Sequence, residues 1–369
     1  MPLRALNGTP PPPSHHDRQP GTSFLRSLAQ VDGTVYSAAG LFVFVHCGAR
    51  DVIREAAAYQ GLGPRLRLRE TIGTSAGSVA ALCDVLGLSG SVMFECLRRV
   101  SEEESETLHL NPMRMFSTLG MISPAILEAL ALMLLRQRVG DQASTLTLGG
   151  MHDMTGIRFV AVAYNVSQEQ VAYLSHETYP DLPVWKAICM SCCIPGLVEP
   201  IVWGGSMYVD GGVCEALPVG AVRLSACPLV ISLQPCRAGP PPGQMSMPEL
   251  ALRVFHAMNR GPTDALAAAP FAQRPYTALI SLPSTPDYSM IQGLVVPPAL
   301  AARLASYGRE AMCKLLCPSG WLLMALAARR ALVRRDCAGA MGYKPAAAAA
   351  AERVDARFEG VRPSRRRSV

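Results

Sequence analysis

The chain has 369 residues, of which 50% are hydrophobic and 17% are charged. A wholly disordered protein would be poorer in apolar residues, so the composition excludes that class and indicates a large core. No uninterrupted apolar run reaches the roughly 18 to 20 residues that a membrane-spanning helix requires, so a soluble protein is expected.

Residues 1–35 are rich in Pro, Gly, Ser and His, with four consecutive prolines at Pro10–Pro13. This composition predicts a mobile arm, followed by one domain at residues 36–316 and then a helical, Ala-rich and basic tail at residues 317–369. The arm lacks the apolar centre of a secretory signal. We therefore expect a cytoplasmic protein whose 12 cysteines are mostly reduced.

The first part of the domain predicts alternating strands and helices. The run L-F-V-F-V at Leu41–Val45 favours a buried strand, and Ala49–Gln60 has helical composition. A second short strand is expected at Leu66–Ile72, where Gly73 ends it, and a helix of small residues is expected at Ala76–Leu86. Strands that alternate with helices after tight turns indicate an α/β fold with a parallel sheet.

The rest of the domain resumes this pattern after a different middle segment. Residues 101–150 contain no clear strand, so we expect a helical insertion there. Its apolar stretch Ala125–Leu135 is either a buried packing helix or a cap over an active site. Further strands are expected at Arg158–Tyr164, Gln170–Ser175, Met207–Val209 and Leu229–Leu233, and further helices at Pro183–Cys192, Pro248–Met258 and Pro297–Leu316.

Positive charge is concentrated at the C-terminal end. From Arg329 onward the chain carries eleven Lys and Arg residues against four acidic residues, a net charge of +7, whereas the whole chain is +6. The body therefore has no basic field that would attract nucleic acid, which is not expected as a partner, and the alternative of a nucleic-acid binder rests on the tail alone. The tail is either a solvated end or a segment that binds an anionic membrane surface, with nuclear targeting through Arg365–Arg367 as a further alternative.

Ser75 is a candidate nucleophile. It lies in Gly73-Thr74-Ser75-Ala76-Gly77, which fits the pattern G-x-S-x-G between a predicted strand and a predicted helix. The sharp turn between them needs Gly73 and Gly77, because a Cβ at either position would collide with neighbouring backbone. The turn directs the Ser75 hydroxyl to the N-terminus of the helix, where the helix dipole favours developing negative charge. The alternative is that Ser75 only caps the helix.

Asp210 is the candidate base for this serine. A serine hydroxyl is a poor nucleophile until a base accepts its proton. The triplet Asp210-Gly211-Gly212 follows a predicted strand, so it provides a carboxylate at a strand end, and Gly211 and Gly212 permit close approach. An aspartate in an ordinary turn is the alternative.

Three segments in this order resemble the patatin-like phospholipase family: G-T-S-A-G at Gly73–Gly77, S-C-C-I-P-G at Ser191–Gly196 and Y-V-D-G-G at Tyr208–Gly212. The resemblance implies a three-layer α/β/α fold with a central, mostly parallel sheet. It also implies a lipid acyl hydrolase of phospholipase A type, with Ser75 as nucleophile and Asp210 as base in a Ser–Asp dyad. An acyl-enzyme forms on the serine in that scheme and water then releases it, with no histidine, cofactor or metal. The implied substrate is a phospholipid or another lipid ester, and Ala125–Leu135 is then a candidate acyl-chain surface.

One element of the resemblance is altered. The family carries a glycine-rich segment, G-G-G-x-R-G, after its first strand, and its amides bind the oxyanion. After the strand predicted at Leu41–Val45, residues 46–51 read H-C-G-A-R-D, where only Gly48 and Arg50 are kept. We expect the amides of Cys47 and Gly48 to be the oxyanion donors, because backbone N–H groups form such a hole. The Cβ atoms in this segment restrict its backbone angles, and its aspartate puts a negative charge near the anion. A lipid-binding protein with weak or no catalytic activity is therefore an alternative.

Two other arrangements are open. An α/β-hydrolase triad would place Ser75, Asp210 and His256 in that order, with His256 in the helix predicted at Pro248–Met258. A C-x-x-C-C cluster at Cys189–Cys193 has the ligand type for a soft metal, but no second pair or histidine follows at zinc-like spacing. No metal site is therefore expected.

Overall fold

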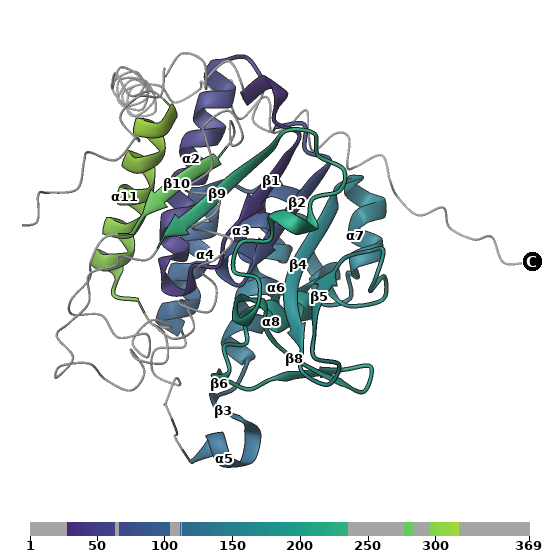
Figure 1. Cartoon of the computed structure of the whole chain (residues 1–369). Coiled ribbons are helices and arrows are strands. Elements are labelled where there is room, and N and C mark those ends of the chain that lie inside the picture. Colours follow the sequence, from purple (N-terminus) through teal and green to yellow (C-terminus); the bar gives the residue numbers. More distant parts are fainter. Residues whose placement is uncertain are drawn as a thin grey trace, which may run out of the picture.

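The structure is a computed structural model of the chain, and it describes residues 28–62, 66–103, 111, 113–234, 277–282 and 296–316. Most of the predicted arm, the helix predicted at Pro248–Met258 with His256, and the predicted tail lie outside the described residues. The described part is built on one large sheet with helices packed against it (Figure 1).

The described residues of the large sheet form eight strands: β1 (Gly33–Tyr36), β2 (Glu70–Thr74), β4 (Arg158–Asn165), β5 (Gln170–Leu174), β7 (Ile201–Trp203), β8 (Ser206–Asp210), β9 (Pro228–Gln234) and β10 (Thr277–Ser281). Their order is β10-β9-β1-β2-β4-β8-β7, and β5 also pairs with β4. The five strands from β10 to β4 are parallel, whereas β8, β7 and β5 add antiparallel pairs. A separate parallel pair joins β3 (Gly120–Ile122) to β6 (Gly196–Val198).

The longer helices are α2 (Val43–Tyr59), α3 (Ala76–Val85), α4 (Gly90–Glu103), α6 (Ala125–Val139), α8 (Val184–Cys192) and α11 (Pro298–Leu316). Shorter elements are α5 (Arg114–Thr118), α7 (Leu148–Thr155) and the 3-10 turns η2 (Leu28–Gln30), η3 (Gly40–Phe42), η4 (Gly140–Ser144), η5 (Gly211–Val213) and η6 (Val219–Ala221). In the described ranges, no helix combines the length and the apolar character needed to cross a bilayer.

The two faces of the sheet are buried in separate cores. On one face Phe159 of β4 packs in a large core with the longer helices. On the other face Val160 and Val162 pack in a smaller core with Leu217 and Ala221, around η6. Burial of both faces explains the uninterrupted apolar run from Phe159 to Tyr164 in β4. The predicted α/β class, with a central, mostly parallel sheet between covering layers, is confirmed.

The strand predicted at Leu41–Val45 is wrong. These residues lie in η3 and the first turn of α2. The run is too short to show a period by itself, but buried positions continue at Ala49, Val52 and Ala56 with the spacing of a helix face. The first strand of the described residues is β1, so residues 28–35, which the sequence places in the arm, belong to the domain.

Other predicted elements agree more closely with the structure. The strands predicted at Arg158–Tyr164 and Gln170–Ser175 are the antiparallel pair β4–β5. The helices predicted at Pro183–Cys192 and Pro297–Leu316 are α8 and α11. The insertion at residues 101–150 contains mainly helices, but it also carries β3, which no sequence pattern indicates.

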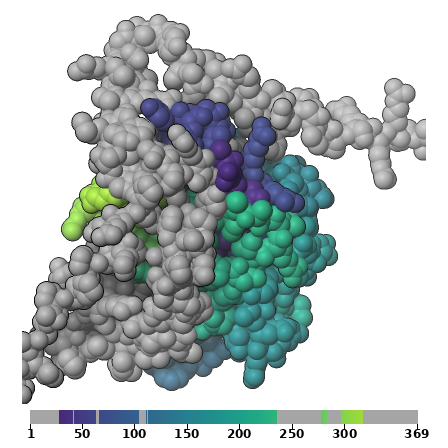
Figure 2. Space-filling model, turned by 45° about the horizontal axis from the view of Figure 1, so that its top comes forward, coloured from purple at the N-terminus to yellow at the C-terminus, as the bar shows by residue number. Residues whose placement is uncertain are grey.

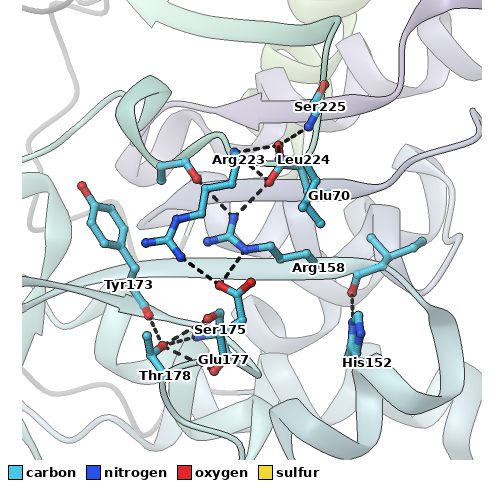
Figure 3. Close-up of polar contacts among 12 residues, drawn as sticks. Glu70, His152, Arg158, Tyr173, Ser175, Glu177, Thr178, Arg223, Leu224 and Ser225 are labelled. Atoms are coloured by element: carbon cyan, nitrogen blue, oxygen red, sulfur yellow. Dashed lines mark hydrogen bonds and ion pairs between the residues drawn. The ribbon is translucent and has the colours of Figure 1, made fainter.

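A buried ion pair lies where β2 and β4 begin, at the opposite end of β2 from Ser75. Arg158 Nη1 donates to Glu70 Oε2 at 3.0 Å, and their side chains are only 2% and 1% exposed (Figure 3). Glu70 also accepts three consecutive backbone N–H groups, at residues 223–225. Glu177 pairs with both Arg158 and Arg223. The green segment before β9 accordingly lies beside teal residues on the surface (Figure 2).

Candidate active site

Two strands end next to each other along β4. β2 runs parallel to the first part of β4 and ends with Thr74 paired with Val162. β8 runs antiparallel to the second part, and its last residue, Asp210, pairs with Ala163. Because β5 occupies the opposite edge of β4, β2 and β8 share one edge and meet end to end. The fold thus brings together Ser75, which follows β2, and Asp210, as their motifs predict.

Ser75 occupies the sharp turn between β2 and α3. Its φ of 55° and ψ of −130° form a conformation that residues with a Cβ rarely adopt. A Cβ on Gly73 would lie 2.2 Å from the carbonyl oxygen of Gly77, and one on Gly77 would lie 2.5 Å from that of Tyr36. Close backbone approach therefore requires both glycines, for the reason that the sequence indicates.

The Ser75 hydroxyl points at the Asp210 carboxylate. Ser75 Oγ donates to Asp210 Oδ2 at 2.6 Å. The second carboxylate oxygen, Oδ1, accepts the N–H of Gly212 at 2.7 Å, which fixes the orientation of the group. A Cβ on Gly211 would lie 2.4 Å from the carbonyl oxygen of Val162, so this glycine lets the chain turn directly against β4.

Burial sets the protonation of Asp210. Asp210 is only 1% exposed to solvent, and Ser75 is 5% exposed. Loss of water around the charged form raises the pKa of Asp210 to about 7, although the hydrogen bonds from Ser75 and Gly212 oppose the rise. A carboxyl group with a pKa near neutrality is suited both to accept and to return a proton.

Ser191 holds the turn that carries Ser75. Its Oγ accepts the N–H of Ser75 at 3.0 Å and donates to the carbonyl oxygen of Val162 at 2.6 Å. Two residues later, the carbonyl oxygen of Cys193 accepts the N–H of Asp210 at 2.8 Å. The segment at the end of α8 thus contacts both halves of the candidate site. Sequence reasoning did not single out Ser191, whose one signal was its place at the start of S-C-C-I-P-G.

The cysteines of this segment are buried. The Cys193 thiol donates to the carbonyl oxygen of Cys189 at 2.8 Å, and Cys192 Sγ lies 3.8 Å from Ser78 Oγ. Burial raises the pKa of all three thiols, to about 12 for Cys189, so they are neutral and pack as small apolar groups. Among the residues that the structure describes, no three His, Cys, Asp or Glu side chains are grouped to hold a metal ion.

The oxyanion donors predicted at Cys47 and Gly48 are wrong. Both residues lie inside α2, where backbone N–H groups bond within the helix. Gly48 instead permits contact with α11, because a Cβ there would lie 1.8 Å from the carbonyl oxygen of Ala305. The error follows from the misplaced first strand, since the chain that leaves β1 is Ser37–Gly40.

Arg50 also lies away from the Ser75 hydroxyl. Its buried guanidinium donates to Asp84 Oδ1 from Nε at 3.1 Å and from Nη2 at 2.7 Å. The Tyr36 hydroxyl donates to the other oxygen of Asp84 at 2.7 Å. This network fastens α2 to α3 and β1, so Arg50 supports the helix that follows Ser75 and does not contact the candidate site.

An apolar pocket of about 120 Å³ lies beside Ser75. Its walls come from η3 and the starts of α2 and α3, from α4 and α6, and from the segment after α8. Ile126, Leu127 and Leu130 of α6 line the pocket, whereas Leu134 and Leu135 of the same helix are buried in the core. The apolar stretch predicted at residues 125–135 therefore serves both as a packing helix and as a pocket wall.

Comparisons with known proteins give a family match and a viral relative. Residues 35–223, about half of the chain, match the family model of patatin-like phospholipases. The probable lipid hydrolase 463L of Invertebrate iridescent virus 6 is 25% identical over 84 residues, which are 23% of this chain and 29% of that protein. The chain thus matches less than a third of the viral relative.

Two bacterial structures are also similar to this chain. VipD from Legionella pneumophila has a TM-score of 0.43 and 13% identity, with 78% of this chain and 67% of that chain covered. ExoU of Pseudomonas aeruginosa, solved in its complex with SpcU, has a TM-score of 0.42 and 14% identity, with 78% and 51% covered.

Proposed function

Because the chain belongs to the patatin-like phospholipase family, we propose that it is a lipid acyl hydrolase in which Ser75 is the nucleophile and Asp210 the base. The observation that carries this proposal is the 2.6 Å hydrogen bond from Ser75 Oγ to Asp210 Oδ2. A donor and acceptor at this distance are ready for proton transfer, and no histidine lies between them.

The proposed reaction has two steps. Ser75 Oγ attacks the ester carbonyl carbon while Asp210 Oδ2 takes its proton, and the proton then passes to the departing alcohol oxygen. The acyl group is left as an ester on Ser75. Asp210 next takes a proton from a water molecule that attacks this ester, and returns it to Ser75 Oγ as the fatty acid leaves. The carboxyl group ends each step in its starting state, which a pKa of about 7 favours.

We place the oxyanion donors at Gly40 and Ala76 in place of the helix-bound amides. Both residues line the pocket beside Ser75. Each is the first residue of a helical segment, η3 or α3, and the first N–H groups of such a segment have no partner within it. Gly40 has a φ of +51°, which suits glycine, so the chain after β1 keeps one glycine where the geometry needs it.

The pocket favours an acyl chain as the group next to Ser75. Apart from Ser101, its lining from α4 and α6 is apolar, and a hydrocarbon chain gains about 0.8 kcal/mol for each CH₂ group that leaves water. A phospholipid or another lipid ester is therefore the proposed substrate class.

The test is hydrolysis of phosphatidylcholine, triacylglycerol and a short-chain ester by Ser75→Ala and Asp210→Asn beside the unmodified chain. We expect each variant to lose at least about 10³-fold in kcat. Ser232→Ala is the control, because Ser232 is a buried serine of β9 whose Oγ has no partner in the described part of the chain. Retained hydrolysis by Ser75→Ala would contradict the proposal.

Two further measurements separate the alternatives. A serine-directed phosphonate should label Ser75, whereas a lipid-binding protein without catalysis would bind vesicles and remain unlabelled. His256→Ala should leave kcat nearly unchanged with a dyad, but a Ser–His–Asp triad would lose nearly all turnover.

We also propose that the tail from Arg329, which lies outside the described residues, binds an anionic membrane surface. Its +7 charge attracts anionic lipid, and salt screens that attraction over about 10 Å at 0.1 M. Deletion of residues 329–369 should weaken binding to phosphatidylserine vesicles at low salt and have little effect at high salt. The same deletion assayed with DNA tests the nucleic-acid alternative.

A further inference from the structure

Four large apolar side chains are exposed around α5. Met113 is 72% exposed, Met115 40%, Phe116 78% and Leu119 51%. Met113, Phe116 and Leu119 are spaced by three residues along α5 and its two caps, so they gather on one side of the short helix, and Met115 adjoins them. We call these four residues the α5 patch. Exposed apolar groups in such a cluster mark a contact surface, whereas single ones are ordinary.

The patch is held in place from its opposite side. Arg114 of α5 pairs with Glu199, so the basic group next to the patch is already neutralised. The N–H of Asn111 donates to the carbonyl oxygen of Met121 at 3.3 Å and closes the loop. The Asn111 side chain accepts the N–H of Met113 at 3.0 Å. The loop is therefore fastened while Met113, Phe116 and Leu119 stay largely exposed, and Figure 1 shows α5 projecting from the body beyond β3 and β6.

Leu119 adds backbone strain at the same place. It has a φ of +62° at the C-terminal cap of α5, a left-handed conformation that glycine or asparagine adopts more easily. Such a conformation costs roughly 1 kcal/mol or more for a residue with a Cβ. An exposed leucine at this position does not relieve the strain, and its side chain does not fill the core.

The patch adjoins the wall of the Ser75 pocket. A Cβ on Gly196 would lie 3.7 Å from Met115 Sδ, so α5 rests directly against the start of β6. Ile194 and Leu197, on either side of that contact, line the pocket. They also join Ile122 of β3 in one small apolar cluster. The segment from Ile194 to Leu197 thus lines the pocket and also contacts the α5 patch.

We propose that the α5 patch inserts into the surface of a lipid aggregate and holds the Ser75 pocket against it. This proposal rests on the proposed function, because a lipid ester must leave its aggregate to reach Ser75. The occupant is a lipid surface because the patch is apolar, carries no unpaired charge on α5 and lies beside an apolar pocket. Insertion of such side chains depends on apolar area, so binding should persist on neutral lipid and at high salt.

The test is flotation with phosphatidylcholine vesicles, using the full chain with Ser75→Ala as the background so that no lipid is consumed. Phe116→Ser combined with Leu119→Gly should lower the partition coefficient at least about tenfold, or about 1.4 kcal/mol. Leu119→Gly alone should weaken partition in part while its melting temperature is unchanged or higher, because glycine relieves the positive φ. Leu224→Ser is the control, since Leu224 is also exposed but its backbone contacts Glu70 at the far end of β2.

The same patch variants, made with Ser75 intact, should turn over a water-soluble monomeric ester at the unmodified rate, because none of the four residues lines the pocket. Equal partition of the patch variants and the control would overturn the proposal. It would also be overturned if the patch variants only converted a dimer of this chain to a monomer. Partition is measured without catalysis, so the flotation result can be interpreted even if the hydrolase proposal fails.

Discussion

Thr74 and Asp210 pair with adjacent residues of β4, Val162 and Ala163, although they come from strands that run in opposite directions. The head-to-head meeting of β2 and β8 is what places the Ser75 hydroxyl against the Asp210 carboxylate. The geometry of the pair therefore depends on β4 and on the groups that tie each strand end to it, as much as on the two motifs.

Ser191→Ala should lower kcat by roughly 10- to 100-fold. The variant removes the Oγ that links the Ser75 N–H to the carbonyl oxygen of Val162, so the Ser75 hydroxyl loses its fixed position. Two buried groups also lose their partner, at about 1–3 kcal/mol of unfolding free energy. Steady-state kinetics should show the loss in kcat and little change in KM. Ser191→Thr keeps the oxygen and should restore most of the rate, whereas equal loss with threonine would count against a positioning role.

The rate of ester hydrolysis should rise with pH through about 7. Asp210 must be unprotonated to accept the serine proton, and burial raises its pKa to about 7. His46 cannot produce this transition, because burial lowers its pKa to about 4. A kcat/KM profile from pH 5 to 9 on a soluble ester measures it. A flat profile, or one that falls as pH rises, would contradict Asp210 as the base.

The same group should make the fold less stable as pH rises. The pKa of Asp210 is about 7 in the folded chain against an ordinary value of 3.8, so the folded state binds more protons between these values. The free energy of unfolding therefore falls from about pH 4 to pH 7 and then levels off. Asp210→Asn lacks this titration, so its stability relative to the unmodified chain should grow by on the order of 3 kcal/mol from pH 4 to pH 8. Urea unfolding at the two pH values gives the comparison, and a constant difference would refute it.

The sequence predicted the Ser75–Asp210 pair because its signals are local. Gly73, Gly77 and Gly211 are needed by contacts within a few residues of the turn or directly across a strand, and such requirements appear as motifs. The tie through Ser191 joins positions 116 residues apart with a common side chain, so it leaves no pattern.

The misplaced oxyanion segment has a different cause. The run at Leu41–Val45 favours a strand by composition, but its residues lie in η3 and the first turn of α2, where the backbone of Val45 approaches α11. Because β1 has only four residues, Gly33–Tyr36, no period marks it in the sequence. One wrong strand then shifted the oxyanion donors to Cys47 and Gly48, inside the helix.

Gly48→Ala and Gly308→Ala should destabilise the fold and leave the activity of the folded molecules unchanged. A Cβ on Gly308 would lie 2.1 Å from the carbonyl oxygen of Val45, and one on Gly48 meets Ala305 in the same way, so either methyl group forces α2 and α11 apart. Such overpacking costs typically 1–3 kcal/mol. Gly150→Ala is the control, because the nearest atom to its Cβ would be 3.5 Å away. A specific loss of kcat in Gly48→Ala at full stability would revive the oxyanion role.

Glu70→Gln should lower the free energy of unfolding by about 3–5 kcal/mol, because it removes the buried partner charge of Arg158 and leaves only Glu177, which is partly exposed. The amide nitrogen of the variant also faces donors in either orientation, the Arg158 guanidinium or the backbone N–H groups of residues 223–225 that the carboxylate accepts (Figure 3). Since Glu70 begins β2 and Ser75 follows its other end, kcat per folded molecule should stay the same. Arg99→Ala, which removes an exposed pair with Glu95, should cost less than about 1 kcal/mol. Urea unfolding of both variants measures the contrast, and similar losses would mean that the buried pair contributes no more than a surface one.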